Sequence, residues 1–183
     1  RAVQRLGPYG DRFVPVQGNY AEMSALARAR EVGRADGVLM DLGFSLWQVQ
    51  APGRGFSFRS DEPLDMRYDP ASPLTAAHIV NSYGEAELAQ LIFQYGEEPR
   101  SRAIARNIVR NRPIGSTAGL ADLVARAVGT RRGHRLHPAT RTFQALRVAV
   151  NDELVHLEAG LKSAIELLAP SGRLVIISYQ SLE

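Results

Sequence analysis

The sequence lacks cysteine, and its hydrophobic runs are short. Without cysteine the chain can form neither disulfides nor thiolate metal sites, which fits a reducing compartment. The longest apolar run lies around "LVIIS" at residues 174–178, far short of the ~18 residues of a membrane span. The first residues, "RAVQRLGPYGDRF", lack the apolar segment of a signal peptide. We therefore expect a cytoplasmic protein that contacts no membrane.

Motifs of several enzyme classes are also missing. The sequence contains no phosphate-binding loop of the G-x-x-x-x-G-K-S/T type and no G-x-S-x-G nucleophile turn. Its four histidines lie at no spacing that is typical of metal ligands, so we expect no metal site.

Lysine is almost absent, and arginine takes its place. The net charge is only +3, yet of 22 basic residues all but Lys162 are arginine. The stretch from Arg100 to Arg147 contains a single acidic residue, Asp122. Because guanidinium groups bind phosphate through paired donors, this local surplus predicts a nucleic-acid or other phosphate-rich partner. The alternative is a solvated surface whose arginines reflect the codon usage of a high-GC genome.

The pattern of apolar residues predicts an α/β fold. We expect a strand over 12–17, then a helix that starts at Asn19 with Glu22 at capping-box spacing and runs towards Gly33. The run "GVLMD" at 37–41 predicts the next strand, and "LVIISY" predicts another near the end of the chain. A strand, a helix and a strand at this spacing indicate a parallel sheet.

Helical segments interrupt this pattern. After a loop rich in Gly and Pro, apolar spacing predicts a helix that Gly96 ends, a second in "RSRAIARNIVRNRP", and a third in "STAGLADLVARAVG" between a Ser116 or Thr117 cap and Gly129. We therefore expect residues 1–50 and 137–183 to form the core domain. Residues 51–136 would form a connecting loop and an inserted, arginine-rich helical lobe.

A long helix is expected from Pro138, because steps of three and four residues between apolar positions continue as far as Leu168. Near its start, Arg141, Arg147 and Asn151 could clamp a phosphate backbone or a base edge. Alternatively, these side chains are internal partners that tie the insert to the core.

The strand at 37–41 ends on a carboxylate, Asp41. In open parallel sheets ligands bind beyond the carboxyl ends of the strands, so Asp41, with flexible Gly43 nearby, is placed to meet a ligand. The alternative is that this carboxylate only caps the turn that follows. Position alone does not separate the two.

Six separated motifs resemble one known family. In order, "DLG-S--Q", "RGFSF", "PLDMR", "HPATRTFQALR", "VNDEL" and "SLE" are similar to the small-subunit ribosomal RNA (cytosine N4)-methyltransferases, from about Phe13 to Glu183. The resemblance implies a Rossmann-like class I methyltransferase sheet with an inserted helical lobe. It also implies S-adenosylmethionine as cofactor and ribosomal RNA or the small ribosomal subunit as partner. The chain starts without Met and stops just after a strand, so we expect a fragment.

The resemblance also assigns residues. Tyr20, Asp41 and Gln48 match cofactor-binding positions. The other candidates do not come from the resemblance: backbone carbonyls around Gly43 and the side chain of Ser45 could orient the cytosine amine, and the arginine surplus and the clamp described above suggest RNA contacts. The residues expected to contact RNA are Arg102, Arg106, Arg110, Arg131, Arg132, Arg135, Arg141, Arg147 and Asn151.

This chain departs from the family pattern at three positions. Leu46 stands where a serine is usual, Trp47 is unusual, and Gln180 replaces a histidine. The second hypothesis is therefore a catalytically inactive, basic RNA-binding or ribosome-assembly protein on the same fold. The oligomeric state is not predicted.

Overall fold

A computed structural model describes residues 2–43, 52–129 and 137–182. The chain divides into two compact units, which we call the sheet unit and the helical unit. The sheet unit runs from the N-terminus to Leu42 and includes Leu154–Ser181, and the helical unit spans Gly43–Glu153. The helical unit thus follows β1 in the sequence and precedes most of α9. Residues 137–153, which the sequence pattern assigned to the core domain, pack with the helical unit instead.

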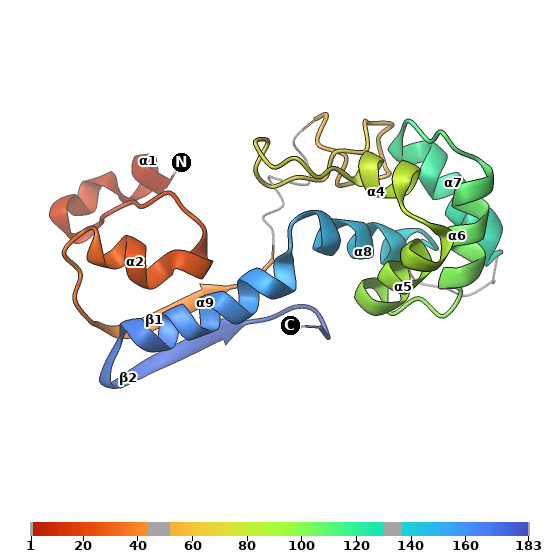
Figure 1. Cartoon of the computed structure of the whole chain (residues 1–183). Coiled ribbons are helices and arrows are strands. Elements are labelled where there is room, and N and C mark those ends of the chain that lie inside the picture. The colour runs from red at the N-terminus through yellow and green to blue at the C-terminus, as the bar shows by residue number, and fades with distance from the viewer. Residues whose placement is uncertain (1, 44–51, 130–136, 183) are drawn as a thin grey trace. The chain divides into compact units, whose positions relative to one another are not determined.

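The sheet unit is built around two parallel strands (Figure 1). Its elements are α1 (Ala2–Leu6), the 3-10 helices η1 (Gly7–Arg12) and η2 (Tyr20–Glu22), α2 (Met23–Arg28), β1 (Ala35–Asp41), α9 (Glu153–Leu167) and β2 (Leu168–Ile177). Val38 pairs with Leu174 and Asp41 with Ile177. The predicted α/β class with a parallel sheet is confirmed.

Alternation along β1 sends one set of side chains into the core. Val38 and Met40 are buried and cluster with Leu157, Ala164 and Leu167 of α9, which lies along the sheet in Figure 1. Helix α9 therefore supports the end of β1 where Asp41 lies.

Two predictions for the N-terminal part of the chain are wrong. No strand forms over 12–17; Val14 and Val16 stay exposed because, among the described residues, only β1 and β2 pair with each other. The helix expected to run towards Gly33 ends at Arg28. Asn19 does cap a helix, since its side chain accepts a hydrogen bond from the amide of Ala21 at 3.0 Å, but this is the 3-10 helix η2. Helix α2 begins at Met23 without a side-chain cap.

The helical unit agrees closely with the predicted helices. It contains α4 (Ala76–Ser82), α5 (Glu85–Gly96), α6 (Ser101–Arg110), α7 (Thr117–Val128) and α8 (Thr140–Val150). Ser116 caps α7 by accepting a hydrogen bond from the amide of Gly119, and Gly129 ends it with a φ of 69°. The loop before α4 contributes Leu64 and Met66 to the same core.

The predicted long helix is broken in two. Helix α8 ends at Val150 and α9 starts at Glu153, with Asp152 at a positive φ of 47°. The break is fixed by a segment distant in the sequence, because Asn151 and Glu153 both bond to the loop before α4. Apolar spacing continued through the junction and therefore gave no sign of it.

Candidate functional site

Asp41 is the last residue of β1 and is exposed at the carboxyl end of the sheet. The amide of Leu42 donates to the carbonyl of Ile177 at 3.0 Å, so hydrogen bonding between β1 and β2 continues to the residue directly after Asp41. Gly43 follows with a φ of 92°, a conformation that glycine adopts without strain. No described residue donates a hydrogen bond to the Asp41 carboxylate, which leaves it available to a ligand.

Tyr20 packs against α9, and a glycine of that helix makes room for it. A Cβ atom on Gly160 of α9 would lie 2.3 Å and 2.5 Å from two ring carbons of Tyr20, and 3.4 Å from the terminal methyl of Met40. The Tyr20 ring and the Met40 methyl therefore both lie next to Gly160, and Met40 directly precedes Asp41 in β1. The tyrosine remains 39% exposed, so part of its ring can receive a ligand.

Gly160, which leaves room for the Tyr20 ring, was not singled out from the sequence. A glycine inside a helix destabilises the helix by about 1 kcal/mol relative to alanine. Its presence in the predicted helix was therefore the sequence signal that another side chain packs closely there.

Several expected site residues lie outside the described residues. They are Ser45, Gln48, Arg131, Arg132 and Arg135, and the family departures Leu46 and Trp47 lie there as well. Within the described ranges there is no group of three or more His, Asp or Glu side chains that could hold a metal ion. In the same ranges, no helix is long and apolar enough to span a membrane.

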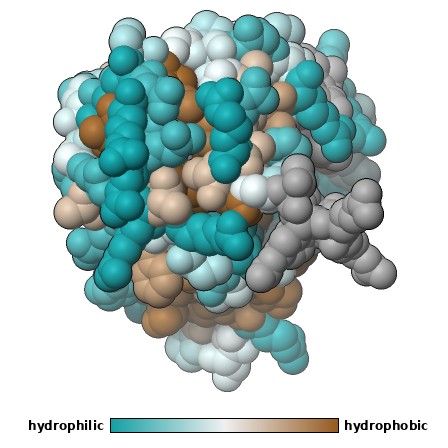
Figure 2. Space-filling view, turned by 90° about the vertical axis from the view of Figure 1, so that its right-hand side faces the viewer, coloured by the Kyte–Doolittle hydropathy of each residue, from teal (hydrophilic) through white to brown (hydrophobic). Residues whose placement is uncertain are grey.

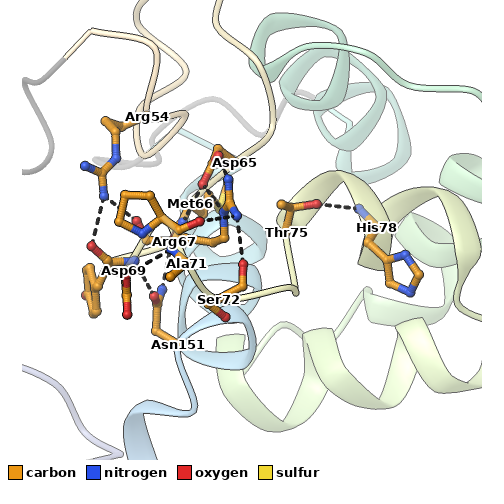
Figure 3. A network of polar contacts seen from close by, with 12 residues as sticks. Arg54, Asp65, Met66, Arg67, Asp69, Ala71, Ser72, Thr75, His78 and Asn151 are labelled. Carbon is orange, nitrogen blue, oxygen red and sulfur yellow. Dashed lines mark hydrogen bonds and ion pairs between the residues drawn. The ribbon is translucent and has the colours of Figure 1, made fainter. Parts of the chain in front are cut away.

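A polar network surrounds Asn151 in the helical unit (Figure 3). The Asn151 side-chain amide donates to the carbonyls of Met66 at 2.8 Å and Arg147 at 2.9 Å, and its oxygen accepts from the amide of Tyr68 at 2.6 Å. Met66 is fully buried and has a φ of 62°. Asn151, expected to contact RNA, is thus engaged in fixing the loop before α4.

Arg147 is also held inside the protein. Its guanidinium donates to both carboxylate oxygens of Glu153, at 2.7 Å and 2.9 Å, and the Tyr68 hydroxyl donates to the same carboxylate at 2.9 Å. Only 7% of Arg147 is exposed. The geometry therefore favours an internal partner over a phosphate clamp for this residue.

Asp65 and Arg67 form an ion pair within the loop before α4. Arg67 donates to both oxygens of Asp65, at 2.9 Å and 2.7 Å, and also to the carbonyls of Pro70 and Ser72, each at 2.7 Å. Chiefly through the hydrogen bond from the Arg67 side chain, the pKa of Asp65 falls below its ordinary value of 3.8.

This pair predicts a pH dependence of stability. Because the folded-state pKa of Asp65 is depressed, its contribution is fully present above the unfolded pKa and is lost as the pH falls through the lower, folded pKa. The difference in unfolding free energy between the wild type and Asp65→Asn should therefore be constant near neutral pH and shrink below about pH 4. Urea unfolding over a pH series measures it. Asp122→Asn, at an exposed position, is the control, and a constant difference down to pH 2 would contradict the assignment.

The arginines of α6 are exposed in the helical unit. Arg102, Arg106 and Arg110 follow one another at intervals of four residues. Figure 2 views the molecule from the right-hand side of Figure 1, and hydrophilic side chains cover much of that face. Of the three, only Arg106 has an ion pair among the described residues, at 3.3 Å to Glu85. Arg141 donates to the carbonyl of Glu97 at 3.0 Å and stays exposed.

Sequence comparison decides the family. The sequence profile of the MraW methylase family matches residues 1–183, which is the whole chain. The chain belongs to the MraW methylase family. This assignment agrees with the observed parallel sheet and helical insert, and the expected class I methyltransferase fold is confirmed.

Three curated relatives carry the name Ribosomal RNA small subunit methyltransferase H. The relative from Carboxydothermus hydrogenoformans is 49% identical over 100% of this chain and 60% of its own length. The relative from Thermomicrobium roseum is 54% identical over 96% and 54%, and that from Geobacter sulfurreducens is 50% identical over 100% and 60%. The chain thus spans between about half and three fifths of the relatives' length.

Proposed function

We propose that the full-length protein transfers a methyl group from S-adenosylmethionine to the N4 amine of a cytidine in small-subunit ribosomal RNA. The observation that carries this proposal is the exposed carboxylate of Asp41 at the carboxyl end of a parallel strand. Family membership and the names of the relatives support it.

The described residues fit an adenosyl cofactor. Asp41 supplies a hydrogen-bond acceptor with no donor among the described residues, and Tyr20 supplies a partly exposed aromatic face beside Met40. An adenosyl group carries both hydroxyl donors and a flat aromatic base, so one acceptor and one aromatic face suit it. Gln48, which lies outside the described residues, is proposed as a further contact.

The cytosine amine must be activated by the protein. S-adenosylmethionine, when bound, supplies a methyl group on a positively charged sulfur. The N4 lone pair is delocalised into the ring, and an acceptor oxygen that receives a hydrogen bond from the amine, ~2.9 Å from N4, localises it and stabilises the developing positive charge. The carbonyl of Gly43 and the hydroxyl of Ser45 are proposed for this role. As the new N–C bond forms, the C–S bond breaks, and N4 releases one proton to solvent.

Methyl transfer from labelled cofactor tests the function. The full-length protein is incubated with small ribosomal subunits and, separately, with naked small-subunit RNA, and the modified nucleotide is identified. We expect label in N4-methylcytidine. RNA binding without label would favour the inactive RNA-binding protein, and label in another nucleotide would refute the N4 assignment.

Gly160→Ala tests the placement of Tyr20. The added methyl must displace the tyrosine ring, so we expect the KM for S-adenosylmethionine to rise about 10-fold, or ~1.4 kcal/mol, with kcat unchanged. Steady-state kinetics of the full-length protein measure both constants. Gly33→Ala, where an added Cβ meets nothing within 4 Å, is the matched control. An unchanged KM in the folded Gly160→Ala protein would remove Tyr20 from the cofactor site.

A further inference from the structure

A groove runs between α6 and α7 of the helical unit, and arginines line it from both helices. Its volume is about 280 Å³. Arg106 and Arg110 of α6 lie along it with Arg126 of α7, and the small side chains Ala103 and Ala127 leave it open. Arg126 had no role in the sequence analysis, because nothing in its own helix distinguishes it.

A side-chain hydrogen bond fixes the two helices that form this groove. Asn107, which also lines it, donates to the carbonyl of Leu123 at 2.7 Å, and Asn111 donates to the Asn107 carbonyl at 2.7 Å. The first contact ties α6 to the backbone of α7 at the groove, and the second lies within the last turn of α6, so the arginines extend from a fixed base.

The positive charge of the groove is poorly compensated. Arg110 and Arg126 make no ion pair or hydrogen bond within the part of the chain that the structure describes. Asp122 precedes Arg126 by one helical turn, yet no ion pair joins them in that part of the chain. Of the three groove arginines, Arg106 alone has a carboxylate partner among the described residues, Glu85, and both of those side chains are about half exposed. Like charges gathered in this way repel one another until an anion binds between them.

We propose that this groove binds the sugar–phosphate backbone of RNA, with Arg106, Arg110 and Arg126 on phosphate oxygens. The inference rests on the proposed function and names the surface on which its substrate would lie. Guanidinium forks match phosphate, and a groove lined by alanine offers no large apolar pocket of the kind that anchors a protein partner. Arg102 extends the row along α6 by one more turn, about 6 Å.

Salt dependence of RNA binding tests the groove. The full-length protein binds a short, fluorescent, single-stranded RNA of mixed sequence, without cofactor, between about 50 and 200 mM salt. Each lost phosphate contact lowers the log–log slope by about 0.7, so Arg110→Gln with Arg126→Gln should lower it by about 1.4. Arg110→Lys with Arg126→Lys keeps both charges and should keep the slope. Circular dichroism verifies that each variant is folded.

The control removes the same charge elsewhere. Arg5→Gln with Arg173→Gln changes two exposed arginines of the sheet unit and should leave the slope unchanged. An unchanged slope in the groove variant, or an equal loss in both pairs, would overturn the proposal. Competition by polyglutamate as effective as that by RNA would point to an acidic protein instead and would also overturn it.

The result of the salt-dependence experiment can be distinguished from the result of the methyl-transfer assay. Methylation with an unchanged salt slope would refute the groove and leave the proposed function standing. A slope reduced as expected, with no methyl transfer to any cytidine, would refute the proposed function and leave the groove as an RNA-binding site.

Discussion

Asp41→Asn in the full-length protein is expected to raise the KM for S-adenosylmethionine about 100-fold, equivalent to ~2.7 kcal/mol, and to change kcat little at saturating cofactor. The reason is its position, since its exposed carboxylate has no donor among the described residues and lies at the carboxyl end of β1. The amide of Asn keeps the shape but loses the charge and half of the acceptor capacity. Initial rates over a range of cofactor concentrations separate the two constants.

Asp36→Asn is the matched control, because Asp36 is exposed near the opposite end of β1. It should leave both constants unchanged. If Asp41→Asn instead lowers kcat by ~10³ with cofactor affinity intact, about 4 kcal/mol of transition-state stabilisation is lost. Asp41 would then act on the cytosine amine, and the cofactor assignment would be wrong.

Glu153→Ala should destabilise the helical unit by about 3–5 kcal/mol, because it removes the carboxylate that holds a buried guanidinium. The side chains of Arg147 and Glu153 are only 8% and 14% exposed, so water cannot easily replace the lost partner. The Tyr68 hydroxyl loses its acceptor in the same substitution. Urea unfolding followed by circular dichroism measures the change.

Glu158→Gln is the comparison for that experiment. Glu158 pairs with Lys162 one helical turn away, and both side chains are about 70% exposed, so solvent screens the pair and no resolvable change is expected. A loss below about 1 kcal/mol in Glu153→Ala would mean that the Arg147 charge is solvated or compensated by other groups.

The helices of the insert could be predicted because their signals are local. Ser116 caps α7, Gly96 ends α5, and Ile104 with Ile108 gives α6 its buried side. Each of these signals lies within the segment that it describes. Such segments are the ones for which apolar spacing is most informative.

The predictions that were wrong concern features that depend on contacts between residues distant in the sequence. Residues 12–17 have the composition of a strand, but a strand also requires a neighbour, and none pairs with them among the described residues. The break between α8 and α9 brings Arg147 and Glu153 together, although residues six apart in a continuous helix lie on different faces. The signal for that break lay in the loop before α4.

The candidate site could be predicted only in part, because some of its contacts also join segments that are distant in the sequence. Asp41 follows from a rule about the ends of parallel strands, and its position on β1 agrees with that rule. The closeness of Tyr20 to Gly160, and of Arg126 to Arg110, arises from packing between segments. Residue type alone could not distinguish Arg147, which is buried, from Arg110, which is exposed.

Position 66 is open to very few amino acids, because its backbone and its side chain favour opposite substitutions. The left-handed conformation of Met66 favours glycine or asparagine, and holding another residue there costs of order 1 kcal/mol or more. Its side chain is fully buried, so truncation would leave a cavity at a cost of about 2–5 kcal/mol. Branching at Cβ would worsen the backbone strain. Random mutagenesis followed by selection for folded protein should therefore recover almost only long, unbranched apolar residues here, with leucine the most frequent replacement.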